Sequence, residues 1–311
     1  MSYIPATGIS EGGSIAFAVL YGIICISHTL IGIYYRRFKV AILMFIGTAF
    51  SCIGYAGRAW YVTDAGISPY VMQSVCIALG PSVVFGAIKE LFIHYITFLK
   101  LEKIDGESNW YHDKRLKNFK LYEVFNVVAN IISAAFIGSG LGTFSNDQTT
   151  SAMDNSINLV LAGFIIQLAL CIISIFLWSY FRVYSSNVIQ LTKKMKIYLY
   201  AILFSFTCIA IRLSYRVAEW GKINRVGIIN NLTSNENYLL LLDGMTTLFA
   251  CVAILIFHPG FVFGKSELIR IDREFETCNQ KGTNNTEGNG EPKKDYKRVL
   301  HYVPIVRFFY K

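Results

Sequence analysis

The stretch "YLYAILFSFTCIAIRLSYRVAEWGK", residues 198–222, places an apolar run directly before a row of charged side chains. Its apolar part is typical of a membrane-spanning helix. Arg212, Arg216 and Glu219 follow at positions i, i+4 and i+7, so in a helix they share one face. Charges at membrane depth are costly and usually face the bundle interior. The stretch therefore predicts a membrane helix whose charged stripe faces other helices.

The composition indicates that this helix is one of several. Hydrophobic residues make up 54% of the 311-residue chain and charged residues 16%, whereas a soluble protein carries roughly 25% charged residues. The first apolar segment lacks the basic start of a cleavable signal peptide. The sequence predicts an all-α membrane protein with seven transmembrane helices, at residues 14–34, 41–62, 70–98, 121–144, 158–180, 197–218 and 238–258.

Lysine and arginine residues are distributed unequally between the two ends of these helices. Twenty-three lie in the connections at residues 35–40, 99–120 and 181–196 and in the tail from residue 259, and two lie on the other side. The positive-inside rule then predicts an N-terminus outside and a C-terminus in the cytoplasm, with the plasma membrane as the expected location. Residues 1–264 are predicted to form the membrane domain, and 265–311 a basic, largely disordered cytoplasmic tail.

Several function classes find no support in the sequence. "GFVFGKS", residues 260–266, resembles the end of a phosphate-binding loop but has three residues between its glycines where four are needed. The five histidines are scattered without metal-ligand spacing. The net charge of +9 suits an anionic membrane leaflet, and no nucleic-acid motif accompanies it. We therefore expect no enzyme, nucleotide, metal, other cofactor or nucleic-acid partner.

Five ionisable residues are expected in the outer half of the membrane: Arg58, Arg212, Arg216, Glu219 and Asp243. Arg216 and Glu219 are near enough to the interface to reach lipid headgroups unaided, so snorkelling is an equal alternative for these two. For the other three, an internal polar cluster is favoured. We predict that Arg212 or Arg216 pairs with Glu219 or Asp243, because pairing offsets the cost of burial.

Polar residues also occur elsewhere within the spans. Lys89 and Glu90 lie near the inner part of the third span, where solvent access or mutual pairing accounts for them. Asn126 and Asn130 share a face of the fourth span, and Gln167 lies in the middle of the fifth. These amides either line a path or bond neighbouring helices, which is the commoner role.

Proline and glycine modify two of the predicted helices. Pro81 is expected to kink the third span and to leave backbone carbonyls for other partners. "GSGLG", residues 138–142, is expected to permit close helix approach or a bend near the outer end of the fourth span.

An ordered set of motifs resembles the fungal lipid-translocating exporters, seven-span proteins of resistance to toxic sterols and other amphiphiles, including a member linked to molasses tolerance. The matching stretches are "GYAGRAW" (54–60), "SPYVMQSVCIALGPSVVFGA" (68–87), "IRLSYRVAEWG" (211–221), "ENYLLLLDGM" (236–245) and "FHPG" (257–260). The chain departs from this family at Asn130 and Ile137, where relatives usually carry aspartate and glutamine.

The resemblance implies a translocator or exporter of amphipathic, lipid-like molecules that confers resistance to toxic compounds. The rival class is a heptahelical receptor or sensor of lipid or stress signals, although the outer loops lack a cysteine pair. Candidate substrate-contacting residues are Arg58, Gln73, Asn130, Gln167, Arg212, Arg216, Glu219 and Asp243. Candidate structural or gating residues are Gly54, Gly57, Pro69, Pro81, Gly138, Gly140 and Pro259. The expected partners are membrane lipids or lipid-like amphiphiles.

Overall fold

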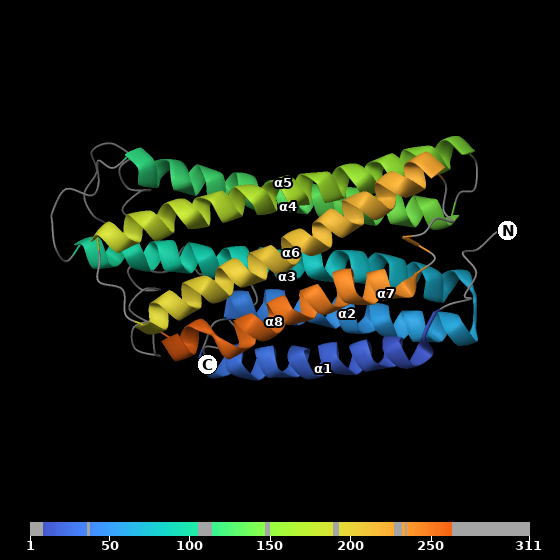
Figure 1. The fold of residues 1–311 in the computed structure, drawn as a ribbon, viewed down its shortest axis with the longest axis horizontal. Helices are drawn as coiled ribbons and strands as arrows, with labels where there is room; N and C mark the ends of the chain where they lie inside the picture. Colours follow the sequence, from blue (N-terminus) through green and yellow to red (C-terminus); the bar gives the residue numbers. More distant parts are fainter. Residues whose placement is uncertain are drawn as a thin grey trace, which may run out of the picture. The chain divides into compact units, whose positions relative to one another are not determined.

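The computed structural model describes residues 9–35, 38–104, 114–146, 150–188, 193–226, 232–233 and 235–262, and these residues form helices and short connections without a strand. Helices run alongside one another, with α6 crossing its neighbours obliquely (Figure 1). In chain order they are α1 (Glu11–Tyr34), α2 (Phe38–Thr63), α3 (Ile67–Ile104), α4 (Lys114–Asn146), α5 (Thr150–Val188), α6 (Lys193–Val226), α7 (Glu236–Tyr238), the π-helical segment η2 (Leu239–Met245) and α8 (Thr246–Ile256).

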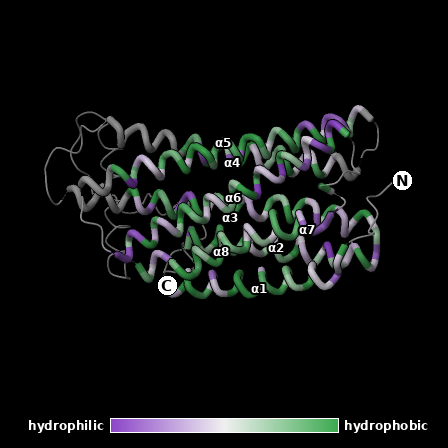
Figure 2. Tube along the Cα trace, in the orientation of Figure 1, coloured by the Kyte–Doolittle hydropathy of each residue, from purple (hydrophilic) through white to green (hydrophobic). Residues whose placement is uncertain are grey.

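The predicted all-helical fold with seven membrane spans is confirmed. Within the described residues, seven helical segments are long and apolar enough to cross a membrane, and each overlaps one predicted span. Apolar residues dominate the middle of the helices (Figure 2). Several helices extend past their predicted ends; α6 occupies 193–226 instead of 197–218 because its helix continues into charged turns. The in–out orientation stays a prediction, and the predicted tail lies outside the described residues.

Local sequence explains where two of the helices begin. Ser10 precedes α1, and its side chain accepts a hydrogen bond from the Gly13 nitrogen at 3.0 Å. Asn235 precedes α7 in the same way, and its side chain accepts from the Asn237 nitrogen at 3.1 Å. Both residues satisfy backbone donors that a helix start leaves without partners. The seventh span therefore begins at Glu236, two residues before its predicted start.

From α1 to α6, consecutive helices pack against one another; α6 also contacts η2 and α8, and α8 contacts α1. The third helix contacts α2, α4, α5, α6 and α8, so it lies at the centre of the bundle. Correspondingly, α3 and α6 bury the largest share of their spans, while α1 and α4 bury the smallest. Large apolar side chains on α1 and α4 are exposed, as expected for surfaces that face lipid.

Close helix contacts depend on glycine. A Cβ at Gly54 of α2 would lie 2.8 Å from the Ile77 nitrogen of α3, and one at Gly80 would lie 2.8 Å from the Gly47 carbonyl oxygen. Small residues let membrane helices approach in this way. The predicted close approach at residues 138–142 is found at Gly140, where a Cβ would lie 2.9 Å from the Ser156 carbonyl oxygen of α5.

Candidate functional site

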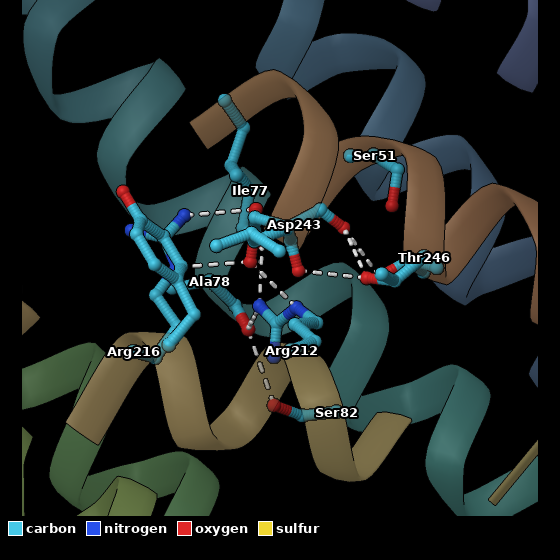
Figure 3. Close-up of polar contacts among 12 residues, drawn as sticks. Ser51, Ile77, Ala78, Ser82, Arg212, Arg216, Asp243 and Thr246 are labelled. Atoms are coloured by element: carbon cyan, nitrogen blue, oxygen red, sulfur yellow. Dashed lines mark hydrogen bonds and ion pairs between the residues drawn. The ribbon is translucent and has the colours of Figure 1, made fainter. Parts of the chain in front are cut away.

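Asp243 lies between two arginines in the interior of the bundle (Figure 3). Arg216 donates two parallel hydrogen bonds to this carboxylate, from Nε to Oδ1 and from an Nη to Oδ2, each at 2.9 Å. The Arg212 Nε lies 2.7 Å from Oδ1 as an ion pair, but without the alignment of a hydrogen bond. Only 1% of the Arg212 and Asp243 side chains is exposed. Ion pairing at this depth offsets much of the cost of removing the charges from water.

Glu219 completes the group that we call the arginine cluster: Arg212, Arg216, Glu219 and Asp243. A second Nη of Arg216 donates to Glu219 Oε2 at 2.8 Å, and Tyr215 donates its hydroxyl to Oε1 at 3.2 Å. All four members are buried. The cluster contains two positive and two negative side chains, so it is neutral when all four are ionised. The predicted pairing of Arg212 or Arg216 with Glu219 or Asp243 is confirmed, and snorkelling of Arg216 and Glu219 is not what the structure shows.

Pro81 explains the other contact of Arg212. Proline has no backbone N–H, so at position 81 it cannot bond to the Ile77 carbonyl four residues earlier. An Nη of Arg212 donates to that carbonyl at 3.1 Å and lies 3.4 Å from the Ala78 carbonyl. The expectation that Pro81 leaves a carbonyl for another partner is thus confirmed. The guanidinium links α3 to Asp243 in the seventh span.

A π-helical segment positions Asp243. The seven residues Leu239–Met245 are wound more widely than an α-helix, and single π turns frequently occur at functional sites. The next residue, Gly244, accepts a hydrogen bond from the Tyr21 hydroxyl at 2.8 Å. Tyr21 stacks on Tyr55, and Tyr55 stacks on Phe17. A Cβ at Gly244 would lie 2.3 Å from the Tyr55 hydroxyl oxygen, so only glycine allows the aromatic rings to approach this segment so closely.

Arg58 pairs outside the arginine cluster. Its Nη2 lies 3.2 Å from Glu236 Oε1 at the start of α7. The second oxygen of Glu236 accepts a hydrogen bond from the Ser10 backbone nitrogen before α1. These side chains are partly buried, with 13% of Arg58 and 10% of Glu236 exposed. The prediction that Arg58 joins the internal cluster with Arg212 and Asp243 is therefore wrong, because a nearer acidic partner is present.

A second group of polar side chains lies between α3, α4 and α5. We call it the polar seam: Ser82, Lys89, Asn126, Asn130 and Gln167. The Ser82 hydroxyl lies 3.1 Å from Gln167 Oε1 and 3.1 Å from the Ala78 carbonyl, which also receives the Arg212 contact. Asn130 Nδ2 donates to the Ser82 carbonyl at 3.4 Å. The seam therefore reaches the arginine cluster through the backbone of α3.

Three amide groups of the seam each have one atom without a hydrogen-bond partner. They are Asn126 Nδ2, Asn130 Oδ1 and Gln167 Nε2. A buried polar atom without a partner costs about 1–3 kcal/mol. Nearly all buried polar atoms in native proteins have a partner, which is often an ordered water, so these three atoms are places where water or a ligand can bind. The amides do bond neighbouring helices, but they keep capacity for a further contact.

The environment of Lys89 differs from the one predicted from the sequence. The ammonium group donates to Asn126 Oδ1 at 2.7 Å and lies 4.3 Å from the centre of the Phe85 ring. Only 8% of the residue is exposed. The sequence interpretation that solvent access or pairing with Glu90 accounts for Lys89 is therefore wrong. Its helical neighbour Glu90 instead contacts His94, one turn further along α3.

The remaining predicted residues belong to neither the arginine cluster nor the polar seam. Gln73 is buried on α3, and its Oε1 has no hydrogen-bond partner. Pro69 lies in the first turn of α3, where proline is tolerated, and Pro259 follows the end of α8. A Cβ at Gly57 would meet the Met72 side chain at 2.6 Å, whereas one at Gly138 would meet only Leu79 at 3.8 Å. The Met72 side chain can move, but the Gln73 nitrogen at 3.2 Å also makes position 57 tight, whereas position 138 has room for a side chain.

Sequence reasoning missed Glu236, Tyr21 and Tyr55 as neighbours of the charged groups. Glu236 precedes the predicted start of the seventh span, so the depth argument left it outside the membrane. The tyrosines look like ordinary apolar helix residues in the sequence. Among the residues with described positions, no group of three or more histidine, cysteine, aspartate or glutamate side chains is arranged to hold a metal ion.

These features define an integral membrane protein with seven helical spans and buried polar groups between them. Residues 44–266 match the family model described as RTA1 like protein, and the chain belongs to this family. The sphingoid long-chain base transporter RSB1 of Saccharomyces cerevisiae is 25% identical over 297 residues, covering 83% of this chain and 74% of that protein. Protein RTM1 of Saccharomyces cerevisiae is 24% identical over 235 residues, covering 73% and 69%. No solved structure matches the chain.

Family membership confirms the recognition made from the motifs. The matched region contains both the arginine cluster and the polar seam. Relatives named as transporters are consistent with transport rather than enzymatic activity.

Proposed function

We propose that the protein is a plasma-membrane transporter of amphipathic, lipid-like molecules and that it has no enzymatic activity. The observation that carries the proposal is the polar seam, a row of buried polar side chains between α3, α4 and α5 whose amides keep three atoms without a partner. A lipid headgroup needs polar partners to move through a membrane, because burying it without them costs several kcal/mol. The name of the relative RSB1, a sphingoid long-chain base transporter, supports the same substrate class.

In this proposal the headgroup moves along the seam while the apolar chain stays among lipid-facing side chains. Asn130 and Gln167 supply the hydrogen bonds that the headgroup loses on leaving water. The arginine cluster lies beyond the seam and holds α3, α6 and the seventh span together. Its charges are already paired, so its principal contribution is to keep the helices in place.

The test uses purified protein in lipid vesicles with a fluorescent sphingoid base and a fluorescent lysophospholipid. We expect the protein to accelerate movement between the leaflets. Gln167→Leu removes an amide with an unpaired nitrogen but keeps its approximate volume, so it should slow movement about tenfold while folded yield is unchanged, since one hydrogen bond is worth about 1 kcal/mol or more. Thr207→Val, an exposed position outside the seam, is the matched control and should leave movement unchanged.

Two outcomes would contradict the proposal. Vesicles that contain the protein and move neither lipid faster than empty vesicles exclude a translocator, and binding without movement would favour the sensor. Equal slowing by Gln167→Leu and Thr207→Val would show that the polar seam does not contribute specifically to lipid movement. In cells, raised expression should increase tolerance to toxic amphiphiles.

A further inference from the structure

Lys89 is a buried amine that none of the described carboxylates contacts. Among the side chains that the structure describes, which leave out those of residues 97–123, no acidic oxygen lies within 4.0 Å of the Lys89 nitrogen, and its direct contacts are Asn126 Oδ1 and the Phe85 ring. The other buried cations differ: Arg212 and Arg216 contact Asp243 and Glu219. An isolated buried charge is costly, so a site of this kind favours an ionic partner of opposite sign.

The groups next to Lys89 are hydrogen-bond donors. The ammonium has three N–H donors, one of which is used on Asn126 Oδ1. The amide nitrogen of Asn126, Nδ2, carries two further N–H donors, and neither has a partner. Asn126 is 4% exposed, so water reaches this amide poorly. One positive charge and several free donors at adjacent atoms match the needs of a phosphate or carboxylate oxygen.

The position of Lys89 indicates what carries the anion. Lys89 lies in α3, which continues for fifteen residues past it to Ile104; the first seven of these, to Ile96, belong to the apolar span and rise about 10 Å. At this depth a small hydrated ion would leave bulk water, whereas an amphiphile would keep its chain in the membrane. Ser82 and Asn130 continue the polar seam from this point toward the arginine cluster. The site is therefore placed where a headgroup would enter the seam.

We propose that Lys89 and Asn126 form an anion site that binds the phosphate or carboxylate headgroup of a single-chain amphiphile. The ammonium contributes the charge and the Asn126 amide contributes directed hydrogen bonds. As a statement about transport, this rests on the proposed function and names an anionic headgroup class within it, distinct from the amine of a sphingoid base. As a statement about binding, it holds for a translocator and a sensor alike.

The experiment measures ligand-induced thermal stabilisation of the full-length protein in detergent. The probes are 1-oleoyl lysophosphatidate, 1-oleoylglycerol, which shares the chain and lacks the phosphate, and inorganic phosphate. We expect lysophosphatidate to bind at least tenfold more tightly than oleoylglycerol, since hydrogen bonds to charged groups are the stronger ones. Inorganic phosphate alone should bind weakly. Equal binding of inorganic phosphate would assign the anion site to a free ion instead of a lipid headgroup.

Two variants separate binding from structure. Lys89→Met removes the charge and should abolish the preference for lysophosphatidate. Asn126→Asp introduces a carboxylate beside Lys89 and replaces the free donors with acceptors, so it should keep or raise the melting temperature and still abolish the preference. If Asn126 only joins α3 to α4, Asn126→Asp would leave the preference intact. Lys194→Met, which removes an exposed charge on α6, is the control and should change neither property.

Failure of this proposal and failure of the transport proposal give different results. A protein that moves lipids but binds both oleoyl probes equally, in the native form and in the Lys89→Met variant, excludes the anion site and leaves transport standing. A protein that prefers lysophosphatidate through Lys89 but moves no lipid keeps the anion site and excludes the translocator.

Discussion

The arginine cluster and the polar seam both lie against α3, but they differ in how their charges and hydrogen bonds are matched. In the arginine cluster, two guanidinium groups contact two carboxylates at 2.7–2.9 Å. In the polar seam, one ammonium group contacts a neutral amide, and three amide groups keep atoms without partners. One region has its polar groups largely satisfied by the protein, and the other leaves capacity for a ligand.

This difference separates two roles that the sequence alone assigned to one set of residues. Paired charges that also bond to backbone carbonyls hold helices together, and removing one partner leaves the other buried and uncompensated. Unpaired groups at comparable burial stabilise the fold less, so they tolerate substitution better. We therefore expect substitutions in the arginine cluster to change stability and substitutions in the polar seam to change ligand binding.

The largest effect should follow from Asp243→Asn. This change removes the carboxylate that serves both Arg212 and Arg216. Breaking a buried ion pair typically costs about 3–5 kcal/mol, which is a large fraction of a protein's stability. Folded yield after solubilisation, measured by size-exclusion chromatography, should fall severely.

Charge balance can be separated from the loss of one side chain by a second substitution. Combining Asp243→Asn with Arg212→Gln restores neutrality, so the double variant should be more stable than the sum of the two single effects predicts. Additive effects would show that the two side chains are not energetically coupled. The claim that the arginine cluster, unlike the polar seam, stabilises the fold through paired charges would then be wrong.

A medium effect is expected from Gly54→Ala, with Gly86→Ala as the matched control. The new Cβ at position 54 would lie 2.8 Å from the Ile77 nitrogen, next to the carbonyl that Arg212 bonds, whereas at position 86 it would lie 3.7 Å from Asn130 Nδ2. Gly54→Ala should lower stability by about 1–3 kcal/mol. Gly86→Ala should be neutral or stabilising by up to about 1 kcal/mol, because alanine favours the helix. Thermal melting in detergent measures both, and equal losses would show that packing is no looser beside the seam.

The smallest effect should come from Arg58→Lys. The partly exposed pair with Glu236 lies at the end of the bundle, and an ammonium can still reach a carboxylate at that position. Loss of stability should be about 1 kcal/mol, because the charge remains and only the second guanidinium contact, from Arg58 Nε to Glu236 Oε1, is lost. Lipid movement in vesicles should be unchanged. Strongly reduced movement with normal folded yield would instead make Arg58 a headgroup contact.

The sequence predicted much of the fold and part of the site. Hydropathy and length located all seven spans, since each must bury its backbone in helices. Helical spacing predicted that Arg212, Arg216 and Glu219 share a face, and the missing N–H of Pro81 predicted a free carbonyl on α3. The partner of Lys89 was not predictable in this way, because α4 approaches Lys89 through tertiary packing. The π turn at Asp243 likewise has no recognisable signal in "LLLLDGM".

The order of the helices in the chain has a consequence for how the protein is assembled during synthesis. Arg212 and Arg216 in α6 precede Asp243, which belongs to the last span. Until that span follows, Arg216 has Glu219 as its acidic partner in the arginine cluster, and Arg212 has none there. The final helix therefore completes the charge balance of a helix inserted before it, and the bundle becomes fully stable only when its last span has docked.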